Sequence, residues 1–209
     1  MFRLTDRFDD VIEYKGNDFY VNLAFDTVLR AYELMQDKRF NNIQKVPIFF
    51  EMFIINGDAA SLSFEDKNKI VKVIFEQFLG YFNKKEKSGS KKSYDLNKDA
   101  AFIYASFLQD YKIDLFEVQG SLHWHKFLSL LNSLSQDTKL AQVINIREQD
   151  VPAPTKHNSK ERQRILELKR IYRLESDEEV VIDADKKMAS ISEGLKREAL
   201  RKKGGINNV

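Results

Sequence analysis

Apolar and polar residues alternate through residues 11–23, on both sides of the pair Gly16-Asn17. Alternation of this kind is typical of a strand with one buried face, and a Gly-Asn pair favours a tight turn. The pattern predicts a β-hairpin with residues 15–18 as its turn. Because a lone hairpin is only marginally stable in water, we expect its apolar face to pack on helices.

From residue 25 onward, apolar residues recur every three or four positions, which predicts amphipathic helices. Pro47 falls inside the second helix and implies either a later helix start or a kink. Ser63 precedes the third helix in a sequence close to a capping box. The fold class is therefore expected to be mainly α, with one or more small helical domains and the hairpin packed on the helices. The expected helices span residues 25–35, 42–55, 63–82, 95–110, 121–134, 138–146 and 159–172.

Changes in composition divide the chain into four predicted segments. Residues 1–82 hold the hairpin and the first helices. Residues 83–94 are almost entirely polar and rich in lysine, which predicts a flexible linker. Residues 95–175 are expected to pack with the first segment as one core. In residues 176–209, acidic and basic runs flank a weak apolar stripe, which predicts a charged, weakly helical C-terminal tail.

The expected helix 121–134 carries Trp124, the only tryptophan of the chain, and two of its three histidines. On a helical wheel of about 100° per residue, Trp124, Phe127 and Leu131 share one apolar arc. His123 falls within this arc, whereas His125 falls on the polar side, about 160° away. We therefore expect Trp124 to be a core residue and His123 to need a buried hydrogen-bond partner.

Two histidines so far apart on a straight helix cannot bind one metal ion, because helical ligand pairs are spaced three or four residues apart. The sequence also contains no nucleotide-binding glycine motif, hydrolase nucleophile motif or calcium loop. We therefore expect no catalytic residues, no bound metal and no cofactor, and the protein is not predicted to be an enzyme.

The overall composition narrows the classes of partner. The 209 residues are 32% charged, yet the net charge is only +2, which does not favour nucleic acid or an anionic membrane. Cysteine is absent, so disulfides and thiolate chemistry are excluded. No run of about 18 apolar residues predicts a membrane span. These features are typical of a soluble intracellular protein.

The order of the segments resembles the bacteriophage gene-product-fifteen family, small tail proteins of long-tailed phages that infect Gram-positive bacteria. The resemblance covers residues 1–175, and its signature lies at Leu122, His123 and Trp124, with Phe127 and Leu131. His125 departs from the family, whose members often carry a second tryptophan there. The signature continues through Leu134, Thr138 and residues 144–147, which end at Arg147, and Lys169, Tyr172 and Leu174 close it. Further matches precede it at residues 3–6, 12–14, 25–30, 99–107 and 111–115.

The resemblance implies a tail assembly chaperone, encoded by a phage or prophage, that works in the cytoplasm of the bacterial host. The family is thought to bind the tape measure protein while the tail assembles, through protein–protein interaction and without catalysis. The tail tube protein is a further candidate partner, and self-association is left open. The alternative is a structural tail protein, or a head–tail connector or completion protein, that stays in the virion.

Overall fold

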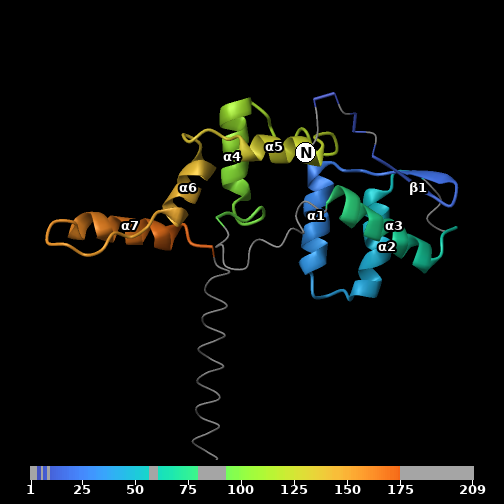
Figure 1. Cartoon of the computed structure of the whole chain (residues 1–209), viewed down its shortest axis with the longest axis horizontal. Helices are drawn as coiled ribbons and strands as arrows, with labels where there is room; N and C mark the ends of the chain where they lie inside the picture. Colours follow the sequence, from blue (N-terminus) through green and yellow to red (C-terminus); the bar gives the residue numbers. More distant parts are fainter. Residues whose placement is uncertain (1–3, 6, 9, 57–60, 80–92, 175–209) are drawn as a thin grey trace, which may run out of the picture. The chain divides into compact units, whose positions relative to one another are not determined.

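The computed structural model describes residues 4, 5, 7, 8, 10–56, 61–79 and 93–174. The predicted linker, apart from residues 93 and 94, and the predicted tail lie outside these residues. The described chain is mainly helical, with an N-terminal antiparallel hairpin that packs on the helices (Figure 1). The predicted fold class is confirmed, whereas the predicted boundaries of the four segments stay a prediction.

The hairpin consists of β1 (Val11–Tyr14) and β2 (Asn17–Tyr20), paired with Val11 opposite Tyr20. Lys15 and Gly16 form its turn, and both have positive φ angles, 53° and 76°. The turn therefore spans residues 14–17, one residue earlier than the predicted 15–18. The difference arises because Lys15 adopts a left-handed conformation in which glycine or asparagine is usual. Ile12 and Phe19 are buried, so one face of the hairpin joins the core.

The first helices are α1 (Phe25–Gln36), α2 (Asn42–Phe53) and α3 (Phe64–Val73), followed by a π-helical turn, η1 (Ile74–Phe78). A capping box of Asn41 with Gln44 starts α2, so Pro47 lies inside the helix and the suggested later start is wrong. Ser63 caps α3 by accepting the N–H of Asp66, as the sequence suggested. The carboxylate of Asp66 also accepts the hydroxyl of Tyr14, which ties the hairpin to α3.

The later helices are α4 (Ala100–Tyr111), α5 (Trp124–Asn132), α6 (Lys139–Glu148) and α7 (Ser159–Ile171). Three of them start later than predicted, α4 by five residues, α5 by three and α6 by one. The predicted start of α4 near residue 95 is wrong, because the Asp95 carboxylate accepts the N–H groups of Asn97 and Lys98 and so forms a turn instead.

The chain divides into two compact units. Unit 1 comprises residues 1–92 and 99–142, and unit 2 comprises residues 93–98 and 143–209. In unit 1, the backbone N–H of Phe25 donates to Leu122 and that of Trp124 donates to Leu23. These bonds join the start of α1 to the start of α5, so the two stretches of sequence in unit 1 form one folded body.

The core of unit 1 is an aromatic stack centred on Phe127. Its ring lies 4.9 Å from that of Phe25, 5.2 Å from that of Phe107 and 5.5 Å from that of Trp124, with the rings nearly parallel in each pair. All four side chains are buried. Offset stacking of this kind adds to the free energy gained by removing the rings from water. The stack therefore joins α1, α4 and α5.

Replacing Trp124 by alanine should lower the free energy of unfolding by about 3–5 kcal/mol, because a large buried side chain is lost and a cavity remains. Urea denaturation followed by far-UV circular dichroism measures the change. Phe116→Ala is the matched control and should have a small effect, since Phe116 is 71% exposed. Near-wild-type stability of Trp124→Ala, combined with lost partner binding, would show that Trp124 is an interface residue instead.

Candidate partner-binding surface

His123 caps the N-terminus of α5. Its backbone is extended, with φ −61° and ψ 142°, and its ring Nδ1 accepts the backbone N–H of His125 at 3.1 Å. The other ring nitrogen, Nε2, lies 2.9 Å from a carboxylate oxygen of Asp10. Since Nδ1 is an acceptor, the proton belongs on Nε2, from which it is donated to Asp10. The Asp10 carboxylate is therefore the hydrogen-bond partner that we expected for the His123 imidazole.

The predicted position of His123 within the helix is wrong. α5 starts at Trp124 rather than at residue 121, so the 160° separation from His125 does not apply. The two imidazole centroids are 5.3 Å apart. Among the residues that the structure describes, no group of three or more His, Cys, Asp or Glu side chains could hold a metal ion. The geometric reason against a shared metal therefore fails, and the absence of a bound metal stays a prediction.

Phe8 covers this histidine pair. Its ring stacks on His123 at a centroid distance of 4.1 Å, and the ammonium of Lys126 lies 5.4 Å from the same ring. Burial lowers the pKa of His125, the neighbouring His123 lowers it further, and Asp10 acts in the opposite direction. These surroundings favour the neutral form of His125. The cluster fastens the segment before β1 to the start of α5.

The remaining signature residues are also part of the scaffold. Trp124, Phe127 and Leu131 are buried in unit 1. Arg147 belongs to unit 2, where its Nε donates to the carbonyl of Tyr172 at 2.6 Å and its Nη1 donates to that of Ser93 at 3.0 Å. Lys169 in turn donates to the carbonyl of Arg147. Arg147 thus joins α6 to the end of α7 and to residue 93.

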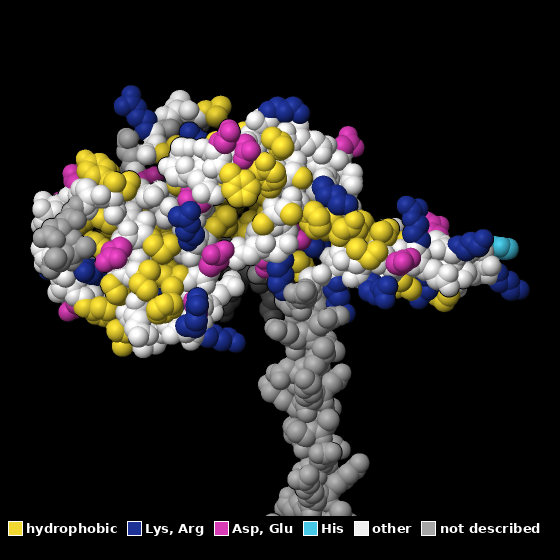
Figure 2. Space-filling model, turned by 180° about the vertical axis from the view of Figure 1, so that it is seen from behind, with side chains coloured by type: hydrophobic (Ala, Val, Ile, Leu, Met, Phe, Trp, Pro, Cys, Tyr) yellow, Lys and Arg dark blue, Asp and Glu magenta, His cyan; other side chains and the backbone are white. Residues whose placement is uncertain are grey.

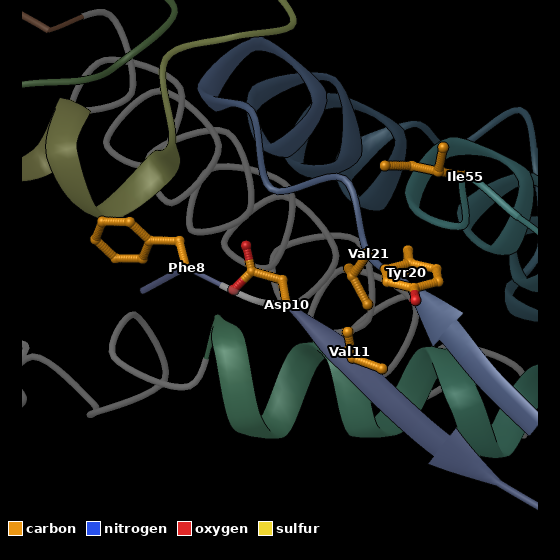
Figure 3. Close-up of a pocket in the computed structure, with 6 residues that line it drawn as sticks. All are labelled: Phe8, Asp10, Val11, Tyr20, Val21 and Ile55. Atoms are coloured by element: carbon orange, nitrogen blue, oxygen red, sulfur yellow. The ribbon is translucent and has the colours of Figure 1, made fainter. Parts of the chain in front are cut away.

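An open pocket of about 500 Å³ lies beside the histidine cluster (Figure 3). Phe8 and Asp10 come from the chain that leads into β1, and Tyr20 lies at the end of β2, so the walls of the pocket lie at the open end of the hairpin, away from its turn. The carboxylate of Asp10 is already bonded to His123, which leaves mainly apolar walls. Such a pocket can accept an apolar side chain of a partner. Its other lining residues are Val11, Val21 and Ile55.

Several large apolar side chains of unit 1 are exposed. Ile55 at the pocket is 70% exposed and Tyr20 is 52% exposed, while Ile43 on α2 reaches 68%. Figure 2 shows hydrophobic side chains gathered over the helices of this unit, among scattered charges. The sequence did not single out these residues, because an apolar residue near the end of a helix or strand gives no signal of its exposure. Within the described ranges, no helix is long and apolar enough to cross a membrane.

Replacing His123 by alanine should lower the free energy of unfolding by about 1–2 kcal/mol, because α5 loses its cap and Asp10 loses its partner. His123→Asn should cost less, since asparagine also accepts a hydrogen bond at this position. Ser129→Ala, at an exposed position on the same helix, is the control. Equal losses for the alanine and asparagine variants, measured by urea denaturation, would contradict the capping role.

The lowered pKa of His125 predicts a pH-dependent stability. The unfolded chain binds a proton at His125 near pH 6.5, above the pH at which the folded protein does. The free energy of unfolding should therefore stay at its full value above pH 6.5, as far as His125 is concerned, and decrease as the pH falls below that point. Urea denaturation at pH 7.5 and pH 5.5 measures the effect, and His125→Asn should reduce the difference. An unchanged difference in that variant would assign the effect to another group.

Comparison with known protein families gives a match over most of the chain. The family described as Bacteriophage Gp15 protein matches residues 4–174, most of the chain. No curated protein and no solved structure matches the chain. The matched range includes the aromatic stack, the His123 cap, the pocket and the helices of unit 2 up to Leu174. The chain therefore belongs to the Bacteriophage Gp15 protein family.

Proposed function

We propose that the protein is a bacteriophage tail assembly chaperone that binds the tape measure protein during tail assembly, without catalysis. The observation that carries this proposal is the set of large apolar side chains left exposed on unit 1, among them Phe116 and Leu108. Exposed apolar groups that lie together mark surfaces for protein partners. Membership of a bacteriophage protein family supports a role in a phage particle or its assembly.

The tape measure protein fits the chemistry of these surfaces. Before assembly, this long helical protein exposes apolar stripes, which need cover until tail subunits polymerise around them. A folded protein with apolar surface on a rigid core can supply that cover, because helices recognise apolar grooves through residues spaced three or four apart. The binding would take place in the cytoplasm of the bacterial host, and the tail tube protein is a second candidate partner.

Co-expression with the neighbouring tape measure protein tests the proposal. The expected result is that the tape measure protein becomes more soluble and co-purifies with this chain, whereas it aggregates when expressed alone. The matched control is co-expression with an unrelated helical protein of similar charge. If the tape measure protein is neither solubilised nor retained by the full chain, the proposed function is wrong.

Mass spectrometry of purified virions separates a chaperone from a structural protein that remains in the particle. A chaperone leaves during assembly and should be absent from virions, while the major tail proteins are detected. A fixed number of copies of this chain per particle would instead support the alternative, a structural tail protein or a head–tail connector or completion protein.

A further inference from the structure

The helix α4 is apolar on both of its faces. Residues 100–108 include no charged side chain. Ile103 and Phe107 point into the core, and the buried hydroxyl of Ser106 accepts the N–H of Leu140. A helix that is apolar all round is normally buried all round. The outer face of α4 is nevertheless exposed.

This outer face is a continuous apolar strip. Ala101, Ala105 and Leu108 follow one another at spacings of four and three residues, and all three are exposed. Tyr104 borders them on the same side of the helix, half-buried. Phe116, in the loop after α4, extends the strip, because its ring lies 5.2 Å from that of Tyr104. These five residues are called the α4 patch below.

Asp114 holds the aromatic end of the α4 patch in place. Its carboxylate accepts the hydroxyl of Tyr104 at 3.1 Å and the backbone N–H of Phe116 at 2.8 Å. Phe116 is thereby fixed in an exposed position, where it gains little from burial in its own chain. A preorganised exposed ring loses little conformational entropy when a partner covers it. Phe116 therefore has the properties of an interface anchor.

The shape of the α4 patch suits a helix. Ala101 and Ala105 lack bulky side chains and leave a shallow strip beside Leu108 and Tyr104, into which a ridge of another helix can pack at a separation of about 8–10 Å. An extended strand would find no backbone partners here, because the N–H and C=O groups of α4 bond within the helix.

The aromatic end of the α4 patch has an acidic border. Asp114 and the exposed Glu117 lie next to Tyr104, and both carboxylates contribute to its environment. The hydrogen bond to Asp114 raises the pKa of Tyr104 most, followed by burial and by the charges of Asp114 and Glu117. Lysine or arginine residues that border the apolar stripe of a partner helix would face these charges, and such complementarity favours the correct partner.

We propose that the α4 patch is the docking site for an amphipathic helix whose apolar stripe is bordered by lysine or arginine. This inference rests on the proposed function, so the helix belongs to the tape measure protein. Leu108 and Phe116 supply the apolar anchors, Ala101 and Ala105 allow close approach, and Glu117 pairs with the basic border.

The test uses the full chain co-expressed with the tape measure protein and compares single variants. Leu108→Lys and Phe116→Lys should each reduce the amount of co-purified tape measure protein about tenfold, because each removes an anchor and repels the basic border. Ile171→Lys, at an exposed apolar position on α7 of unit 2, is the matched control and should retain binding within about twofold. Ile55→Lys tests the pocket as the alternative contact.

The charge of the border is tested separately. Glu117→Lys should weaken binding more than Glu117→Gln, and the difference should shrink at high salt as charges are screened. Fluorescence of Trp124 confirms that each variant is folded, since Trp124 stacks on Phe127, which in turn contacts Phe107 of α4.

The outcomes separate this inference from the proposed function. If the wild-type chain does not bind the tape measure protein, the proposed function fails and the named partner of the α4 patch fails with it. If the wild type binds and the Leu108 and Phe116 variants bind equally well, only the α4 inference is overturned. It is also overturned if Ile55→Lys alone abolishes binding, or if Phe116→Lys changes self-association of the chain rather than partner binding.

Discussion

The stacking of Phe127 against aromatic rings from α1, α4 and its own helix is the interaction on which unit 1 depends. The contacts to Phe25 and Phe107 join separate segments of the chain, so the stack closes the loops between them and offsets the entropy of that closure. The backbone bonds between residues 23–25 and 122–124 form beside it, where water is excluded. Without Phe127, these bonds would lose the packing that aligns them.

The same stack determines which side chains of α4 are exposed on the surface of unit 1. Because Phe107 is fixed inside, α4 can turn only one face inward, and its other face stays in contact with solvent. Two polar clusters of unit 1 hold segments of this arrangement together. Asp10 bonds to the His123 cap, and Asp114 bonds to Tyr104. The scaffold is thus built from polar and aromatic contacts inside, and large apolar side chains stay exposed on its surface.

The sequence predicted the features that depend on local periodicity. The hairpin, the order of the helices and the inward position of Trp124 follow from alternation and helical spacing. The sequence did not predict the positions of residues that depend on contacts between distant parts of the chain. His123 continues an apolar arc on the wheel, yet its bond to Asp10, 113 residues away, holds it outside the helix as a cap. Histidine is also not among the usual capping residues. Phe116 gave no signal at all, because an apolar residue in a loop is indistinguishable from a buried one until its surroundings are known.

Hydrogen exchange of the complex with the tape measure protein tests the central claim most directly, because it locates the contact without any substitution. Amides in the loop around Phe116, which are not protected by a regular helix, should exchange more slowly in the complex, together with the outer face of α4. The hairpin and Ile55 should exchange at the rate of the unbound protein. Slower exchange confined to the hairpin and Ile55, or no change at any amide, would contradict the account.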